Sequence, residues 1–457
     1  MSMLSLLHAA VTAKRAESFT PQQIHDLQQK RFRKLLRHVL QNSRFYRRYY
    51  KEHGITEHDV DAVKPEDLPV IDKQIIMENY DDLVCDPALK KDALERFIAE
   101  SPDAGTKYKS KYRVIHTSGS SGTVGLFVYG PSDWVVAKAI GIRAAGVSFN
   151  PFARTRLAFI GATDGHYTSV TTVRNAPRLL FKVITLSVNG PLEETCRDTE
   201  RFRPDGLVGY ASAIGLLAQE QIASNVSITP KKVWCTGEPL TPAIRTNIEK
   251  AFGVNPINTY GTSETMTCGA ECDDSHRLHL FDDWFSVQVV DKALQPVKPS
   301  QTGRVVMTNL YNYTQPLIRY QLDDEVVLSD EPCPCGWPFP VIDELAGRSE
   351  EFLWFTKADG RKEVISPHVL GTFFVPGLEK FQFIQTGTDG LTMKAVVHSE
   401  RDRVVPAIRE RMTEILSPTG LNETMQFKVE LVDHIQNDPK TGKFRRIIPC
   451  SEKSERS

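Results

Sequence analysis

One short segment decides the fold class: Val233-Trp234-Cys235-Thr236-Gly237-Glu238-Pro239-Leu240-Thr241-Pro242. Its first three residues, Val233–Cys235, are apolar and predict a buried strand. Thr241 is a good helix cap, Pro242 suits the first turn of a helix, and Gly253 stands where that helix is expected to end. A buried strand followed at once by a helix is the repeating unit of sheets that are covered by helices.

The same alternation of apolar strands and helices extends to both sides of this segment. Leu157–Ile160 and Leu207–Val208 read as buried strands, and a helix is expected from Ser212. Further along, Phe285–Val290 and Arg304–Leu310 predict two antiparallel strands joined by a polar turn. We therefore expect an α/β fold, with a large N-terminal domain of mixed sheets and helices that ends in a β-rich part.

A second, smaller domain is expected at the carboxyl end. Past Arg348 the order is two strands, a helix and a third strand: Phe381–Gln385, Leu391–Val397, Val404–Leu416 and Phe427–Leu431. This order predicts a compact α+β unit. The predicted domains are residues 1–347 and 348–457.

Composition and charge narrow the class of protein. The chain contains 56 Lys+Arg and 57 Asp+Glu, so nothing global favours nucleic acid as a partner. Thr20 and Pro21 predict the start of a helix whose basic face we interpret as solvated. Eight cysteines are too few for a disulfide scaffold, Met1–Ala13 is a poor signal peptide, and no apolar stretch is long enough for a membrane span. These features predict a cytoplasmic enzyme.

A hydroxyl- and glycine-rich segment reads His116-Thr117-Ser118-Gly119-Ser120-Ser121-Gly122-Thr123 and lies between two strand-like runs, Tyr112–Ile115 and Leu126–Tyr129. Glycines admit positive φ and close approach of the backbone, while N–H groups and hydroxyls donate to phosphate oxygens. The segment is not a Walker A loop, because no Gly-Lys-Ser/Thr follows and no helix is expected to open there. It predicts phosphate binding, and the alternative is an ordinary hairpin.

This loop resembles the Thr-Ser-Gly-Ser-Ser-Gly signature of the acyl-adenylate-forming superfamily, and further segments match that family in the expected order. They are Cys235–Leu240, Asn258–Glu264, Pro316–Asp324, Gly347–Glu351 and Pro439–Lys443. The Pro-Leu-Ile-Arg-Tyr wording at 316–320 and the Cys-Pro-Cys-Gly segment at 333–336 are most similar to the phenylacetate–CoA ligase group and the related deazaflavin-adenylylating synthetases. The resemblance spans nearly the whole chain.

The resemblance implies a site for ATP and Mg²⁺. The residues that would bind the phosphates are Thr117, Ser118, Gly119, Ser120, Ser121, Gly122 and Thr123, and those that would border the adenine are Gly237, Glu238, Pro239, Thr259, Tyr260, Gly261 and Thr262. Glu264 would help to hold Mg²⁺, and Asp324 would grip the ribose hydroxyls. Arg348 would face the ribose or a phosphate, Glu350 falls at the hinge between the domains, and Lys443 matches the catalytic lysine.

These residue types suit the chemistry. A carboxylate that attacks the α-phosphorus of ATP is one anion approaching another, so catalysis must screen their repulsion and align them. A mobile ammonium such as that of Lys443 can contact both the acid and the α-phosphate. The alternative for Lys443 is a solvated lysine of the tail, and for Asp324 it is plain surface charge beside Asp323 and Glu325.

The implied function is ATP-dependent activation of a carboxylic acid to an acyl-AMP, with release of pyrophosphate and transfer to CoA, a carrier-protein thiol or an amine. Two alternatives stay open: transfer of AMP to a small-molecule hydroxyl, and a non-catalytic nucleotide-binding protein on the same scaffold. Asp323 replaces the glycine that precedes the family's ribose aspartate, and Trp354–Lys362 replaces its usual glycine-rich continuation. The second departure leaves CoA open as the acceptor. A homodimer also stays open.

The acid itself cannot be read from the sequence. By analogy with the family, its pocket is expected near Phe159, His166 and Tyr210, although core or surface positions fit His166 and Tyr210 equally well.

Four residues have the inventory of a closed zinc site: Cys272, His279, Cys333 and Cys335. The spacing is not that of a zinc finger, and Cys268 or His276 could replace members of the set. We expect zinc in a structural role, because adenylation needs no open coordination position. The alternative is a set of unconnected thiols and imidazoles in two loops.

Overall fold

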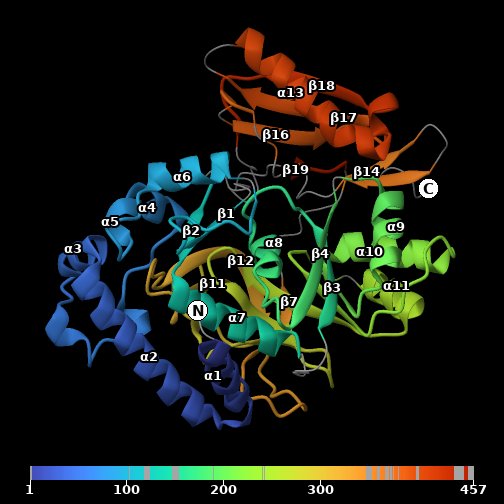
Figure 1. The fold of residues 1–457 in the computed structure, drawn as a ribbon. Coiled ribbons are helices and arrows are strands. Elements are labelled where there is room, and N and C mark those ends of the chain that lie inside the picture. The colour runs from blue at the N-terminus through green and yellow to red at the C-terminus, as the bar shows by residue number, and fades with distance from the viewer. Residues whose placement is uncertain are drawn as a thin grey trace. The chain divides into compact units, whose positions relative to one another are not determined.

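The computed structural model contains helices at the amino end, a large mixed sheet in the middle of the chain and a small sheet near the carboxyl end (Figure 1). It describes residues 3–450 except 102, 118–123, 147–153, 189, 239, 241, 346–352, 358–360, 366–369, 371–372, 374, 379, 398–400 and 437–446. The chain divides into two compact units, which are described separately. Unit 1 comprises Met1–His116, Leu126–Thr185 and Phe202–Ser349, and unit 2 comprises Thr117–Gly125, Leu186–Arg201 and Glu350–Ser457.

Helices dominate the first hundred residues. They are α1 (Met3–Arg15), η1 (Ala16–Ser18), α2 (Pro21–Asn42), α3 (Arg44–Glu52), η2 (Glu57–Asp59), η3 (Pro65–Asp67), α4 (Lys73–Glu78), α5 (Tyr80–Leu83) and α6 (Lys91–Glu100). The predicted start of α2 is confirmed. Thr20 Oγ1 accepts from the Gln23 N–H at 3.2 Å, and Gln23 Oε1 accepts from the Thr20 N–H at 2.8 Å, which forms a capping box ahead of Pro21.

One mixed sheet of eleven strands forms the centre of the fold, in the order β10-β11-β12-β13-β9-β8-β7-β6-β5-β3-β4. Its strands are β3 (Thr155–Gly161), β4 (Phe181–Ser187), β5 (Gly206–Gly209), β6 (Lys232–Thr236), β7 (Pro256–Thr262), β8 (Met266–Glu271), β9 (Leu278–Leu280), β10 (Phe285–Val290), β11 (Thr302–Asn309), β12 (Tyr320–Leu328) and β13 (Val341–Leu345). Strands β3, β5, β6 and β7 pair in parallel. The pairs that continue the sheet from β7 through β8, β9, β13, β12 and β11 to β10 are antiparallel. The predicted α/β part followed by a β-rich part is confirmed.

Further helices alternate with the strands: α7 (Pro131–Ala144), α8 (Thr168–Arg174), α9 (Leu192–Phe202), α10 (Ala211–Ile222) and α11 (Pro242–Phe252). The helices predicted from Ser212 and after Thr241 correspond to α10 and α11. Helix α10 packs against β5 and lies side by side with α11 (Figure 1). Pro242 is the first residue of α11, and Gly253 follows its end with φ +67°, a conformation that favours glycine. The expected cap, Thr241, lies outside the described residues.

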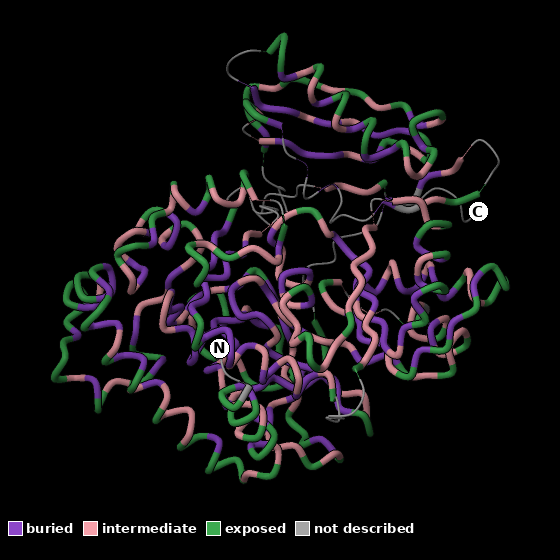
Figure 2. Tube along the Cα trace, in the orientation of Figure 1, coloured by how far each residue is buried: buried purple, intermediate pink, exposed green. Residues whose placement is uncertain are grey.

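A separate two-stranded sheet precedes α7. It pairs β1 (Arg113–His116) with β2 (Leu126–Tyr129) in antiparallel register, and Arg113 lies opposite Tyr129. All four residues of β2 are buried. Figure 2 shows the same concentration of buried positions along the strands of unit 1, whereas exposed positions follow the outer turns of its helices.

Unit 2 contains the predicted β–β–α–β order, with additions. The predicted elements are β16 (Lys380–Gln385), β17 (Gly390–Val396), α13 (Arg401–Leu416) and β18 (Gln426–Leu431). A short strand, β19 (Ile447–Ile448), completes a sheet in the order β18-β17-β16-β19, and a further hairpin pairs β14 (Leu353–Thr356) with β15 (Lys362–Ile365). Two short helices, η4 (Ser417–Thr419) and η5 (Leu421–Glu423), follow α13. Apolar side chains of α13, β16 and β17 form one buried core.

The boundary predicted between residues 347 and 348 falls within 346–352, outside the described residues, and it stays a prediction. Among the helices that the structure describes, none combines the length and the apolar character needed to cross a membrane.

Candidate functional site

Two predicted carboxylates of unit 1, Glu264 and Asp324, are buried. Glu264 lies in the turn between β7 and β8 and is 2% exposed, while Asp324 lies on β12 and is 4% exposed. Burial of a carboxylate costs free energy unless polar groups meet it. We therefore expect specific polar partners for both side chains.

Tyrosines provide those partners in a crossed arrangement. The hydroxyl of Tyr320, on β12, donates to Glu264 Oε1 at 3.2 Å. The hydroxyl of Tyr260, on β7, donates to Asp324 Oδ2 at 3.0 Å. Each motif therefore supplies the hydroxyl that holds the carboxylate of the other motif. The segments predicted to bind magnesium and ribose come together in one place.

The turn that carries Glu264 is fixed by three side chains from two other segments. The Tyr129 hydroxyl donates to the Ser263 carbonyl at 3.0 Å, and the Tyr311 hydroxyl donates to the Thr265 carbonyl at 2.9 Å. Asn309 Nδ2 donates to the carbonyl of Glu264 at 3.4 Å. Because Tyr129 is the last residue of β2, the strand that follows the predicted phosphate loop lies against this turn.

The strand pattern separates Asp324 from its acidic neighbour. Alternate residues of β12 are buried from Tyr320 through Leu322 and Asp324 to Val326. The side chain of Asp323 points the other way, is 54% exposed, and lies 3.9 Å from the ammonium of Lys73. Its charge therefore does not lie on the buried face that carries Asp324.

The residues predicted to border the adenine lie together where β6 and β7 end. Thr236 pairs with Thr259 in the parallel register, and the Thr259 hydroxyl donates to the Cys235 carbonyl at 3.0 Å. Gly237 follows with φ +76°, and a Cβ placed there would lie 3.1 Å from the ring of Tyr210. A larger residue would therefore press on that ring.

Other members of this set are engaged in local structure. The Glu238 carboxylate accepts from the N–H and the hydroxyl of Ser212 at 3.1 and 2.6 Å, so it satisfies the first turn of α10. Thr262 and Thr265 share a hydroxyl hydrogen bond of 3.0 Å. A Cβ at Gly261 would lie 2.4 Å from the Met266 carbonyl oxygen, so this position has no room for a side chain.

Of the three residues suggested for the acid pocket, Tyr210 lies close to Gly237. The rings of Phe159 and Tyr210 meet edge to face, with centroids 6.4 Å apart. His166 is fully buried: its Nε2–H donates to the Ser101 carbonyl at 2.5 Å, and its backbone N–H donates to His116 Nε2 at 3.2 Å. The pocket assignment stays a prediction.

Several predicted site residues cannot be placed. Thr117 is described, and it closes the base of the loop by accepting from the Gly125 N–H through Oγ1 at 2.7 Å. The remaining loop residues 118–123 lie outside the described residues, as do Pro239, Arg348, Glu350 and Lys443.

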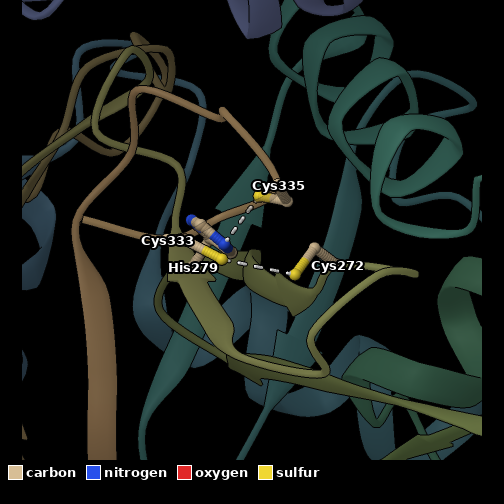
Figure 3. A group of neighbouring side chains, drawn as sticks. All are labelled: Cys272, His279, Cys333 and Cys335. Atoms are coloured by element: carbon tan, nitrogen blue, oxygen red, sulfur yellow. Dashed lines mark hydrogen bonds between the residues drawn. The ribbon is translucent and has the colours of Figure 1, made fainter. Parts of the chain in front are cut away.

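The predicted zinc ligands do come together. Cys272 follows β8, His279 lies on β9, and Cys333 and Cys335 lie between β12 and β13. Figure 3 shows the four side chains turned toward one another, and their ligand atoms all lie within 4.8 Å of one another. Cys272 Sγ lies 3.7 Å from Cys333 Sγ, and Cys335 Sγ lies 3.4 Å from His279 Nε2.

This geometry fits a tetrahedral zinc ion. With Zn–S bonds of about 2.3 Å, two thiolates of a tetrahedron are about 3.8 Å apart. His279 Nδ1–H donates to the Phe339 carbonyl at 3.1 Å, which leaves Nε2 as the ligand atom. Burial also lowers the pKa of His279 and so favours the neutral imidazole that a metal needs. The Trp337 N–H, 3.4 Å from Cys335 Sγ, would stabilise a bound thiolate.

The two substitutes considered from the sequence do not join this set. Cys268 is fully buried and its Sγ donates to the Tyr260 carbonyl at 3.6 Å. His276 Nε2 is hydrogen-bonded to Asn255 at 2.9 Å. The alternative of unconnected thiols and imidazoles is wrong for the four residues named above.

Sequence reasoning missed the role of Tyr320, which was quoted only as part of a motif. The sequence indicates only that Tyr320 and Asp324, four positions apart on one strand, share a face; it does not indicate that Tyr320 contacts Glu264.

Comparisons with known proteins support the family resemblance. No protein-family model matches the sequence. A phenylacetate–coenzyme A ligase of Thermus thermophilus is 26% identical over 345 residues, which covers 74% of this chain and 73% of the relative. Protein CapK of Staphylococcus aureus is 23% identical over 452 residues, which covers 93% of this chain and 89% of the relative.

The fold matches solved ligase structures. A 2-hydroxyisobutyryl-CoA ligase, in complex with 2-HIB-AMP and CoA, superposes with a TM-score of 0.65 at 20% identity, covering 95% of this chain and 91% of that one. The same enzyme in the postadenylation state gives a TM-score of 0.61. With the sequence matches at about a quarter identity, this chain is a distant relative of the phenylacetate–CoA ligases, and it has the fold of a solved adenylate-bound ligase.

Proposed function

We propose that this chain activates a carboxylic acid with Mg-ATP, forms an acyl-AMP with release of pyrophosphate, and transfers the acyl group to a thiol or an amine. One observation supports this most strongly: the Glu264 and Asp324 carboxylates are both buried, and each accepts a hydrogen bond from a tyrosine in the motif of the other. A scaffold that no longer binds a nucleotide has no need for such a pair.

In this proposal each carboxylate has a separate task. Glu264 holds Mg²⁺, which neutralises phosphate charge when it is bound. Tyr320 holds Oε1 of Glu264, and Oε2 would be the ligand atom for Mg²⁺. Asp324 accepts from the ribose hydroxyls, so it sets the position of the α-phosphate relative to the acid.

The remaining assignments rest on the family resemblance. Residues 117–123 would donate to the phosphates, and Arg348 would face the ribose or a phosphate. Lys443 would contact the acid and the α-phosphate, with Glu350 as the hinge of the small domain. The acid would enter near Phe159, Tyr210 and Gly237, whose ring and backbone surfaces adjoin in unit 1.

The acceptor is the finer part of the proposal. The Thermus thermophilus relative is named as a phenylacetate–coenzyme A ligase, and the 2-hydroxyisobutyryl-CoA ligase structure contains CoA. We propose CoA or a carrier thiol first and an amine second. The dependence of AMP release on added CoA, carrier protein or amine distinguishes among them.

An ATP–pyrophosphate exchange assay over aryl, fatty and amino acids tests the adenylation step. We expect exchange with at least one class of acid, and a loss on the order of 100-fold in Glu264→Gln and Asp324→Asn. Asp323→Asn is the matched control, since it removes the adjacent exposed carboxylate and should stay within about twofold. Lys443→Ala should lose exchange while it still binds ATP.

Two results would overturn the proposal. ATP binding without exchange for any acid would favour a non-catalytic nucleotide-binding protein. Release of pyrophosphate that requires a hydroxyl substrate and no acid would favour an AMP transferase.

We also propose that Cys272, His279, Cys333 and Cys335 hold one structural zinc ion. Elemental analysis of the purified protein should find about one zinc per chain, and Cys335→Ser should reduce that content strongly. Equal zinc in the two proteins would contradict the assignment, whatever the outcome of the exchange assay.

A further inference from the structure

A buried cation of unit 1 has no acidic partner among the residues that the structure describes. Arg113 is the first residue of β1 and is 8% exposed. Its Nε and Nη1 are buried, and neither has a hydrogen-bond partner within the structure. A buried guanidinium is costly without acceptors, because five N–H donors and a full charge leave water.

The neighbours of Arg113 are aromatic and basic. Its guanidinium carbon lies 5.7 Å from the centroid of the Trp134 ring, on α7. The indole Nε1–H of Trp134 is itself buried without an acceptor. Lys138 follows Trp134 by four residues on α7, so both side chains lie on the face of the helix that Arg113 meets.

The electrostatics of this cluster are one-sided. Burial lowers the pKa of Arg113 to about 10, and no carboxylate raises it again. Burial first, and then the charges of Arg113 and Lys107, lower the pKa of Lys138 to about 8. By contrast, burial lowers the pKa of Arg31 to about 10 while the Asp283 carboxylate acts in the opposite direction. The cluster formed by Arg113, Trp134, Lys138 and Lys107 is a set of donors and positive charges that the described part of the chain does not neutralise.

We propose that the Arg113 cluster is an oxyanion site, and that its ligand is the phosphate group of a small molecule. A guanidinium fork matches phosphate oxygens, and the indole N–H adds a neutral donor. Lys138 and Lys107 supply further positive charge, which suits a doubly charged phosphate better than a single carboxylate. The ligand provides the acceptors that the buried N–H groups lack.

This site shares no residue with the predicted nucleotide site. The predicted phosphate loop continues in sequence from His116, at the other end of β1. His116 lies three positions beyond Arg113 along the strand, which corresponds to about 10 Å between their Cα atoms. The proposed site also uses none of the residues assigned to ATP, so it goes beyond the proposed function and does not depend on it.

Calorimetric titration of the full-length protein with inorganic phosphate tests the proposal, at constant ionic strength maintained with sodium chloride. We expect Arg113→Met to weaken the phosphate affinity of this site at least tenfold, since it removes charge-assisted donors at nearly constant volume. Lys138→Gln and Trp134→Phe should each weaken it by about threefold. Lys30→Gln, which removes an exposed lysine of α2, should leave it unchanged.

Phosphate that binds at the nucleotide site contributes equally to wild type and Arg113→Met, so the difference between them isolates this site. Identical titrations for wild type, Lys138→Gln and Trp134→Phe would overturn the proposal, even if Arg113→Met failed to fold. Glycerol 3-phosphate, with glycerol as its control, identifies the source of the phosphate. Tighter binding than inorganic phosphate would indicate a phosphate ester, and equal binding would indicate the free ion; loss of either in Arg113→Met supports the site.

Discussion

The two ends of α7 treat buried positive charge in opposite ways. Near its carboxyl end, Arg143 meets the Asp283 carboxylate through two hydrogen bonds of 3.1 and 2.9 Å, and it also donates to the Ala13 carbonyl at 3.1 Å. Toward its amino end, Trp134 and Lys138 face Arg113, and the structure shows no acidic group opposite them. The same helix therefore carries one neutralised charge and one cluster that is not neutralised.

The difference indicates that the Arg143–Asp283 pair stabilises the fold, whereas the Arg113 cluster binds a ligand. Arg143 and Asp283 are 1% and 0% exposed, and their pair joins α1 to α7 and to the segment after β9. Although the Nε of Arg143 also lacks an acceptor, its charge is compensated within the chain. A charge compensated in this way holds the fold, whereas an uncompensated buried charge indicates a ligand. Glu264 is a third case, a buried carboxylate that meets a neutral hydroxyl.

The largest test of this contrast compares Arg143→Met with Arg113→Met. Arg143→Met leaves the buried Asp283 carboxylate without its main partner, so the free energy of unfolding should fall by about 3–5 kcal/mol. Arg113→Met, in phosphate-free buffer, removes a buried charge that has no partner and should not lower it. Urea unfolding followed by circular dichroism measures both. Equal losses in the two variants would show that the contrast has no energetic basis.

The thiol cluster should show the next largest effect, because three thiolates also need a cation that the chain does not supply. Removal of zinc with a strong chelator should lower the free energy of unfolding by about 3 kcal/mol, the linkage expected for a metal at roughly a hundred times its Kd. Cys335→Ser should be insensitive to the chelator. Cys450→Ser removes an exposed thiol outside the cluster and should respond like wild type. A wild type that ignores the chelator would contradict the zinc assignment.

Asp282 allows a further test near the carboxyl end of α7, because it precedes Asp283 in sequence but does not join the ion pair with Arg143. Burial, and then the charge of Asp283, raise the pKa of the Asp282 carboxyl to about 8. The folded chain therefore binds more protons than the unfolded chain between about pH 4 and pH 8, and the free energy of unfolding falls as pH rises through that window. Asp282→Asn should remove about 2 kcal/mol of this fall between pH 6 and pH 8. Urea midpoints across that range measure it, with Asp323→Asn as the exposed control; parallel profiles for wild type and Asp282→Asn would refute it.

The smallest effect concerns the hydroxyl that meets Glu264. Tyr320→Phe should reduce the exchange rate by about tenfold, because one hydrogen bond to a buried carboxylate is worth about 1.5 kcal/mol. Tyr49→Phe, which removes a phenol hydroxyl on α3, should leave the rate unchanged. An unchanged rate in Tyr320→Phe would mean that Glu264 needs no support from β12.

Much of the fold could be predicted from the sequence, because apolar runs and helix caps are local signals. The strand at Phe285–Val290 and the helix start at Thr20 and Pro21 were predicted from residues within a few positions of each other. The zinc set was also predictable, since cysteine and histidine are rare enough that a cluster of them is informative.

The crossed tyrosines and the Arg113 cluster could not be predicted in this way. Strand β12 is separated from β7 by three strands in the sheet, so the sequence alone does not show that Tyr320 reaches Glu264. The absence of an acidic partner for Arg113 is likewise a property of the packed chain. Residues such as Lys443 and Arg348 rest on the resemblance alone.

The crossed hydrogen bonds also restrict how this enzyme could be re-engineered. Tyr260 donates to Asp324, and Tyr320 donates to Glu264. A chimaera that takes only one of the two motifs from another protein therefore combines each carboxylate with a tyrosine segment of different origin. Exchange of segments among distant ligases should therefore succeed only when residues 258–264 and 316–324 are exchanged together.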